Sequence, residues 1–120
     1  QVGAACHTGN RTCFFNNIVK KEYVEKNPLT VLESVYAVIV DRMKNPKEDS
    51  YTNAVMEKGI DEILKKLGHE CTEIILAAKN PDSDDLKFEI SDFMYHCMIL
   101  MAKKNITWAE IAGELAQREP

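Results

Sequence analysis

Apolar residues recur every three to four positions along most of the chain beyond residue 30, which is the period of an amphipathic α-helix. The longest stripe spans about five turns and consists of Ile60, Ile63, Leu64, Leu67, Cys71, Ile74, Ile75 and Ala78. A second stripe consists of Leu86, Ile90, Phe93, Met94, Cys97, Leu100 and Met101. Both segments are predicted to be helices with one buried face, and both cysteines are expected in the core.

Capping and stop signals limit the predicted helices. Thr30 and Glu33 fit a capping box, although the β-branched run at 38–40 leaves a strand as a competing interpretation. Thr107 and Glu110 fit a second capping box, and Ser83 is expected to cap the second long helix. The predicted helices lie within about 30–45, 50–58, 60–78, 83–102 and 107–115. The fold class is therefore all-α, a bundle of four to five helices.

Residues 1–27 show no helical period, and Asn27-Pro28 marks a boundary. We interpret 1–27 as a non-helical N-terminal remnant with a linker, and 28–120 as the helical domain. The chain opens with Gln1 rather than Met, so we expect a fragment or a processed product.

Composition narrows the class of protein. Hydrophobic residues make up 45% and charged residues 28%, which excludes a disordered or collagen-like chain. The net charge of −4 argues against nucleic-acid binding. No apolar run reaches the ~18 residues of a membrane span, and no signal peptide is visible. The four widely spaced cysteines favour a reducing, cytoplasmic location.

The segment 93–102 predicts self-association. Only Tyr95 and His96 are polar within it, and a helix this apolar needs cover on most sides. A chain of 120 residues offers few elements to supply that cover, so we expect a homodimer.

Two acidic couplets carry the candidate chemistry. Glu70 and Glu73 lie on one predicted helix, and Glu89 and Asp92 lie on the next. Members of an i,i+3 couplet are ~60° apart around the helix and ~4.5 Å apart along it. Each couplet flanks the apolar stripe of its own helix on the same edge. Packing the stripes together would bring four carboxylates into one cleft.

Such a cleft needs a cation. Two unit charges ~5 Å apart repel by ~3 kcal/mol at an effective dielectric constant of ~20. A hard divalent cation relieves this repulsion, and all-oxygen ligands favour Mg²⁺ or Mn²⁺ over zinc. A bound metal orients phosphate oxygens and lowers the pKa of an attacking water. The competing interpretation is that these carboxylates are solvated surface groups.

Four other side chains are candidates for substrate binding. Lys66 is placed to meet a phosphate, but pairing with Glu62 is the preferred interpretation. Lys58 and Lys65 are further phosphate candidates. His96 lies one turn beyond the second couplet, where it either supports the site or is a hydrogen-bonded, half-buried histidine.

The cysteine pair Cys6 and Cys13 is a possible zinc half-site, because thiolates suit zinc. Two ligands do not complete a tetrahedron, however, and the usual C-x₂-C spacing is missing. Two free cysteines are the simpler interpretation.

Longer motifs resemble the phosphoribosyl-ATP pyrophosphohydrolase family of histidine biosynthesis, an all-α nucleotide pyrophosphohydrolase group with an E-x-x-E then E-x-x-D signature. The resemblance covers about 28–119 and is carried by Ser50-Tyr51-Thr52, Glu57-Lys58-Gly59, Ile63-Leu64-Lys65-Lys66, Gly68-His69-Glu70-Cys71-Thr72-Glu73, Ala77-Ala78-Lys79 and Glu89-Ile90-Ser91-Asp92. It implies that both couplets bind Mg²⁺ and that the bundle is a homodimer. His69 departs from the family, which usually has a carboxylate at that position.

The opening segment, from Gln1 to Phe14, resembles the C-terminal end of phosphoribosyl-AMP cyclohydrolase, which is often fused ahead of the first family. That resemblance implies zinc on Cys6, on Cys13 and on an upstream cysteine absent here. The zinc site would therefore be complete only in an intact cyclohydrolase domain. We expect this chain to lack the cyclohydrolase activity.

The implied reaction is Mg²⁺-dependent hydrolysis of the nucleotide phosphoribosyl-ATP to phosphoribosyl-AMP and pyrophosphate, by in-line attack of a metal-activated water. Two rival hypotheses stay open. One is a house-cleaning nucleoside triphosphate pyrophosphohydrolase with the same quartet, and the other is a non-catalytic helical dimerisation module.

Overall fold

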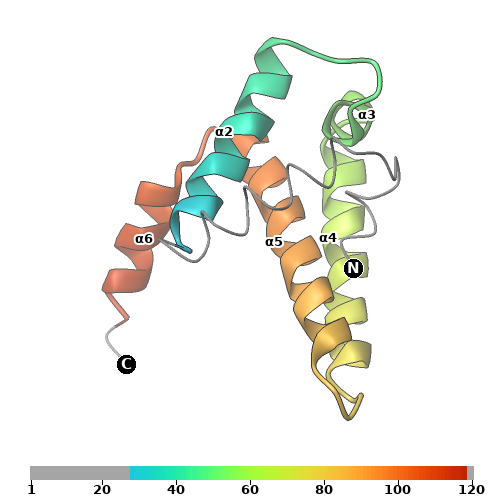
Figure 1. Ribbon diagram of the computed structural model, residues 1–120. Coiled ribbons are helices and arrows are strands. Elements are labelled where there is room, and N and C mark those ends of the chain that lie inside the picture. The colour runs from blue at the N-terminus through green and yellow to red at the C-terminus, as the bar shows by residue number, and fades with distance from the viewer. Residues whose placement is uncertain (1–27, 119–120) are drawn as a thin grey trace. The chain divides into compact units, whose positions relative to one another are not determined.

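The computed structural model describes residues 28–118, and this part of the chain contains five helices and no strand (Figure 1). The helices are α2 (Thr30–Lys44), α3 (Tyr51–Glu57), α4 (Ile60–Ala77), α5 (Asp84–Lys103) and α6 (Trp108–Ala116). The all-α prediction is confirmed, and the competing strand at 38–40 is wrong because these residues are helical. The predicted remnant at 1–27 lies outside the described residues.

The chain divides into two units, and the boundary in the sequence falls between Ser34 and Val35. Within the first unit, the described residues begin α2, where the N–H of Val31 donates to the carbonyl of Pro28. The second unit contains the rest of α2 and the other four helices. Both the core and the candidate site belong to the second unit.

Local signals account for most helix limits. The Ser50 hydroxyl accepts from the N–H of Asn53 at 3.2 Å and begins α3. Gly59 separates α3 from α4 at φ 96°, a region that favours glycine. The Thr107 capping box is confirmed by both of its reciprocal bonds with Glu110. Ser83 occupies the predicted N-cap position of α5, but its side chain makes no capping hydrogen bond there.

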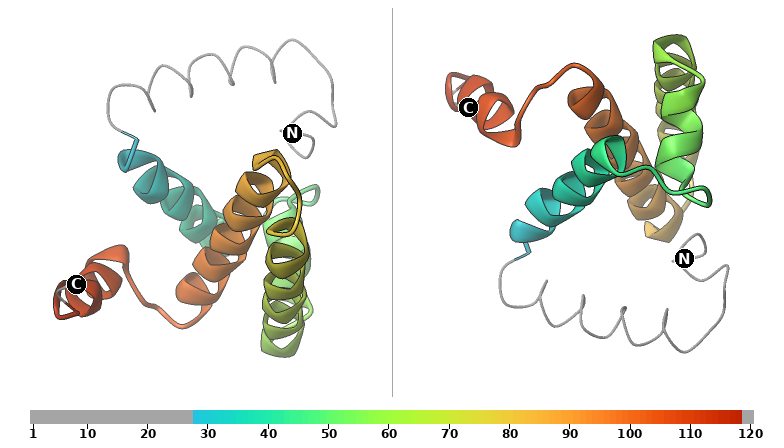
Figure 2. Two further views of the ribbon diagram at one scale, coloured as in Figure 1. Left: turned by 90° about the horizontal axis from the view of Figure 1, so that it is seen from below. Right: turned by 90° about the horizontal axis from the view of Figure 1, so that it is seen from above.

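Helices α4 and α5 lie side by side in both directions of view (Figures 1 and 2). The short connection at 78–83 makes them antiparallel neighbours, and α3 packs against both. Ile63 of α4 and Ile99 of α5 are fully buried. The other buried core members are Ile39, Val55, Met98, Met101 and Ala102.

The buried face of α4 differs from the predicted one. Its buried residues are Ile63, Glu70 and Ala77, each seven residues from the next. This line is turned by about 80° from the centre of the apolar stripe, toward the acidic couplet. Cys71 is consequently exposed, which corrects its expected place in the core, whereas Cys97 is half-buried.

The apolar segment 93–102 finds much of its cover within the chain itself. Met98, Ile99, Met101 and Ala102 are all buried, so this segment does not by itself require a partner. Large exposed apolar residues lie instead on the outer side of α4, where Ile75 is 62% exposed and Leu64 is 48% exposed. Among the described residues, no helix combines the length and apolar character that crossing a membrane requires.

Candidate metal centre

Glu70 places a carboxyl group against the core. Its position in line with Ile63 and Ala77 makes it 8% exposed, which is unusual for glutamate. The Oε1 atom is buried without a hydrogen-bond partner. A buried polar atom left unpaired costs about 1–3 kcal/mol, so this oxygen points to a group that the chain alone does not supply.

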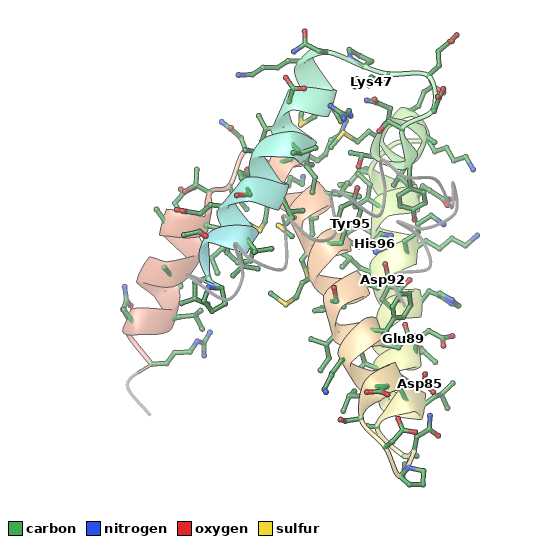
Figure 3. The ribbon with its side chains drawn as sticks, in the orientation of Figure 1. Lys47, Asp85, Glu89, Asp92, Tyr95 and His96 are labelled. Carbon is green, nitrogen blue, oxygen red and sulfur yellow. The ribbon has the colours of Figure 1, made fainter. Side chains whose placement is uncertain are left out.

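Helix α5 brings further carboxylates to the same place. Figure 3 shows Glu89 and Asp92 following one another along α5. Burial, the hydrogen bonding and charge of Asp92, and the charge of Glu89 together raise the pKa of Glu70 to about 7. A carboxylate oxygen of Glu70, one of Asp92 and a ring nitrogen of His96 all lie within 4.8 Å of one another.

The first couplet is not brought together in the same way. Glu73 is partly exposed, and its Oε2 lies 3.6 Å from Nε2 of His69 on its own helix. The three-atom group formed by Glu70, Asp92 and His96 does not include Glu73 or Glu89. The full quartet as a metal site therefore stays a prediction. His69, which departs from the family pattern, is an exposed partner of Glu73.

His96 is the hydrogen-bonded histidine of the second interpretation, and it is 3% exposed. Its Nδ1 lies 2.8 Å from the carbonyl oxygen of Asp92, which only accepts, so Nδ1 carries the proton. The Tyr51 hydroxyl lies 2.8 Å from Nε2 and donates to it in the neutral ring. Both ring nitrogens are thereby occupied. His96 therefore has no free lone pair to offer to a metal, and its Nδ1 also lies 3.6 Å from a carboxylate oxygen of Asp92.

Tyr51 is held in the donor form by its surroundings. Burial of its hydroxyl, followed by the negative charges of Asp92 and Glu70, raises its pKa to about 12. Its ring meets the ring of His96 edge-on, with the centroids 5.7 Å apart. The tyrosine thus remains protonated at any ordinary pH and keeps the imidazole in one tautomer.

A second hydrogen-bonded pair, of two hydroxyls, lies beside the Tyr51–His96 pair. The hydroxyls of Thr52 and Tyr95 are 2.6 Å apart, and Thr52 is buried. Tyr51 and Thr52 are consecutive on α3, and Tyr95 and His96 are consecutive on α5. The sequence offered two signals for these bonds: the Ser-Tyr-Thr motif and the isolated polar pair within 93–102. Neither signal by itself predicts a contact between α3 and α5.

The lysine candidates are spread over the surface of α3 and α4. Lys66 lies 3.6 Å from Glu62, which confirms the preferred interpretation, and its Nζ is 6.0 Å from the centre of the Tyr51 ring. Lys58 and Lys65 are exposed. Their substrate-binding roles stay predictions, as does the zinc half-site of Cys6 and Cys13, which lies outside the described residues.

The donor set fits a hard divalent cation. Carboxylate oxygens are the ligands that Mg²⁺ and Mn²⁺ prefer, and a cation here would meet the unpaired Oε1 of Glu70. It would also offset the repulsion that Asp92 and Glu89 exert on that carboxylate. Glu70 and Asp92 are the residues best placed to hold it.

The sequence matches the phosphoribosyl-ATP pyrophosphohydrolase family over residues 32–119, which is most of the chain. The chain belongs to this family. A relative from Clostridium novyi, named phosphoribosyl-ATP pyrophosphatase, is 51% identical over 75% of this chain and 82% of its own length. One of the same name from Bacillus cereus is 47% identical over 78% of this chain and 84% of its own.

A longer relative also matches the opening segment. The histidine biosynthesis bifunctional protein HisIE of Caldanaerobacter subterraneus subsp. tengcongensis is 45% identical over 97% of this chain and 55% of its own length. The chain thus spans about half of that relative. Because the alignment reaches well ahead of residue 32, it extends into the segment that resembles the cyclohydrolase end.

Glu70 predicts how the stability of the metal-free protein depends on pH. Its folded pKa of about 7 lies above the ordinary 4.5, so its contribution is complete below pH 4.5 and is lost as pH rises through about 7. With a chelator present, we expect the melting temperature of the wild type to fall between pH 5 and pH 8. This fall should exceed that of Glu70→Gln by about 3–8 °C.

Circular dichroism melts measure this difference, and Mg²⁺ added at pH 8 should restore the melting temperature. Glu57→Gln, which alters an exposed glutamate of α3, is the matched control and should keep the wild-type slope. Equal slopes in wild type and Glu70→Gln would contradict the assignment.

The Tyr51–His96 hydrogen bond predicts a loss of metal affinity at a distance. Tyr51→Phe removes the donor to a buried ring nitrogen and frees the imidazole that lies 3.6 Å from the Asp92 carboxylate. We expect about tenfold weaker Mn²⁺ binding by calorimetry, the usual effect of losing an outer hydrogen bond. Tyr36→Phe removes a hydroxyl that donates to the Ile106 carbonyl and should leave Mn²⁺ affinity intact. Equal affinities in both variants would argue against this positioning role.

Proposed function

We propose that this chain hydrolyses phosphoribosyl-ATP to phosphoribosyl-AMP and pyrophosphate, with Mg²⁺ as the first choice of cation and Mn²⁺ as an alternative. Family membership and the names of the relatives support the reaction. The proposal that a cation binds rests on Glu70, whose buried carboxylate oxygen Oε1 has no hydrogen-bond partner and whose carboxylate lies beside Asp92. A cytoplasmic location stays a prediction.

The residues divide the work in a simple way. Glu70 and Asp92 would hold the cation from α4 and α5, and we assign Glu73 and Glu89 to the more open side of the same centre. When bound, the cation would lower the pKa of a water and neutralise phosphate charge. His96, with its proton on Nδ1, lies 3.6 Å from the Asp92 carboxylate and would orient that side chain.

The reaction balances without another reactant. A water oxygen attacks one of the two phosphorus atoms that flank the oxygen joining the AMP part to the pyrophosphate part. The bond from that phosphorus to the bridging oxygen breaks, and the product that keeps the bridging oxygen leaves with the electron pair. The attacking water gives its proton to a base, for which the partly exposed carboxylates on the open side are the nearest candidates. The core-facing position of Glu70 limits access of bulk water on the other side.

Removing a carboxylate should abolish most of the activity. We expect Glu70→Gln and Asp92→Asn each to lower kcat by about 10²-fold or more, on the scale of losing a main charge stabiliser. A pyrophosphate-release assay with phosphoribosyl-ATP, with and without Mg²⁺, measures this. Asp61→Asn, an exposed change on the same helix as Glu70, is the control and should leave kcat unchanged.

The same assay separates the rival functions. Faster turnover of free deoxynucleoside triphosphates than of phosphoribosyl-ATP would indicate the house-cleaning enzyme. Pyrophosphate release at the background value in wild type and variants alike would indicate a dimerisation module.

We also propose a homodimer whose contact includes the outer side of α4. Leu64, Cys71 and Ile75 project from α4 within about 40° of one another, and all three are exposed. These residues belong to the predicted apolar stripe that α5 does not cover. A second copy of the chain is the simplest cover for a stripe of this kind.

Sedimentation at micromolar concentration should show a dimer for the wild type and a monomer for Ile75→Asp, because a buried carboxylate at the contact would lack a partner. Leu115→Asp changes a side chain of similar exposure on α6, 60% against 62%, and should remain dimeric. A wild-type monomer would contradict the proposal.

A further inference from the structure

A pocket of about 510 Å³ lies next to the carboxylate centre but is lined by different residues. It is bounded by the end of α2, the connection 45–50, the start of α3 and one turn of α5. Its polar lining includes Arg42, Lys47, Ser50, Thr52 and Tyr95. We call it the Arg42–Lys47 pocket. None of its lining residues belongs to the acidic couplets.

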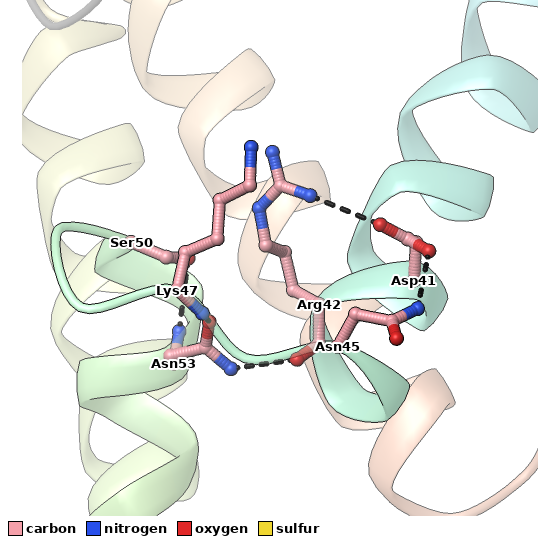
Figure 4. Close-up of polar contacts among 6 residues, drawn as sticks. All are labelled: Asp41, Arg42, Asn45, Lys47, Ser50 and Asn53. Carbon is pink, nitrogen blue, oxygen red and sulfur yellow. Dashed lines mark hydrogen bonds and ion pairs between the residues drawn. The ribbon is translucent and has the colours of Figure 1, made fainter.

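Two positively charged side chains line this pocket, one from the end of α2 and one from the connection that follows it, and hydrogen bonds hold both segments in place. The amide of Asn53 accepts from the N–H of Lys47 and donates to the carbonyl of Arg42, each at 2.8 Å (Figure 4). One side-chain amide therefore ties the end of α2 to the connection and to α3. The side chains of Arg42 and Lys47 extend the same way from this anchored backbone (Figure 4).

Both cations retain binding capacity. One guanidinium nitrogen of Arg42 lies 3.1 Å from Asp41, whose side chain is itself 55% exposed, so this ion pair contributes little. The remaining guanidinium donors are available for a planar, two-point contact. Among residues 28–118, no carboxylate lies within ion-pair distance of Lys47.

The inner wall of the pocket is the Thr52–Tyr95 hydroxyl pair, 2.6 Å apart. The next residue on each helix forms the Tyr51–His96 pair, which faces Asp92. The Arg42–Lys47 pocket and the carboxylate centre are therefore one residue apart along both α3 and α5. A ligand long enough to extend past the Thr52–Tyr95 and Tyr51–His96 pairs would reach both the pocket and the carboxylate centre.

The substrate of the proposed reaction has two separated anionic ends, the triphosphate and the phosphate of the added ribosyl group. We propose that the Arg42–Lys47 pocket binds the ribosyl phosphate, a phosphate monoester, while the triphosphate lies at the carboxylate centre. This inference rests on the proposed function. The pocket would then determine substrate specificity, because a free nucleoside triphosphate has no ribosyl phosphate to place there.

Two carboxylates shape the selectivity of the pocket. Glu48 and Asp49 also line it and are exposed, so the four charged residues of the lining sum to zero. An anion gains there through direct contact with the guanidinium, ammonium and hydroxyl donors, not through a broad positive field. Free phosphate should therefore bind weakly, and a ligand anchored elsewhere by its triphosphate should gain most.

Kinetics with the full chain test the assignment. We expect Arg42→Ala/Lys47→Ala to raise KM for phosphoribosyl-ATP by about tenfold to a hundredfold, with kcat changed less than about threefold. Lys44→Ala removes an exposed charge near the end of α2, outside the pocket, and should leave KM unchanged. Lys47→Ala alone changes an exposed side chain and should give part of the KM effect if the double variant is unstable.

Direct binding separates this inference from the proposed function. Ribose 5-phosphate titrated without Mg²⁺ should bind the wild type at least about tenfold more tightly than the double variant. Wild-type activity with an unchanged KM and an unchanged ribose 5-phosphate affinity in the double variant would overturn the pocket assignment and leave the proposed function standing. If phosphoribosyl-ATP is not hydrolysed at all, the proposed function fails, and the titration still decides the pocket.

The acidic residues of the lining give a second, opposite readout. Glu48→Gln/Asp49→Asn should tighten ribose 5-phosphate binding, because it removes the charges that oppose a phosphate. Weaker binding in this variant would overturn the assignment, since it would mean that the carboxylates, not the cations, hold the ligand.

Discussion

A carboxyl group turned into a helix–helix contact is the constraint on which the rest of this structure depends. Glu70 occupies a position on α4 that its line of neighbours, Ile63 and Ala77, gives to apolar side chains. Its Oε1 atom is left without a hydrogen-bond partner. Burial and the acidic residues of α5 raise the pKa of its carboxyl group. The protein tolerates an unfavourable arrangement at the place where a cation would make it favourable. The same Glu70 oxygen therefore lowers the stability of the metal-free protein and raises its affinity for a metal.

That arrangement also explains how much of the fold and site was visible in the sequence. Helical period, the caps at Ser50 and Thr107, and prolines located the five helices, because these signals act over a few residues. The same period placed Glu70 at the edge of the apolar stripe and Cys71 within it. Which of them faces α5 depends on the rotation of a whole helix, and that rotation balances all of its contacts together.

Contacts between elements far apart in sequence were the part that local signals could not supply. Tyr51 and His96 are 45 residues apart, and only the packing of α3 across α5 brings them together. The histidine itself was a candidate, but its partner determines its role. A histidine with both ring nitrogens occupied supports a neighbouring ligand, whereas the same residue with a free nitrogen would bind metal directly.

The adjacency of the Tyr51–His96 and Thr52–Tyr95 pairs has a consequence for how this protein can evolve. Residues 51 and 52 on one helix, and 95 and 96 on the other, serve opposite sides of a single partition. A mutation that reshapes the Arg42–Lys47 pocket also shifts the wall of the carboxylate centre. Substrate preference and catalytic activity would therefore change together. Divergence toward a new substrate would then begin at the outlying loop positions, where side chains change without disturbing that shared wall.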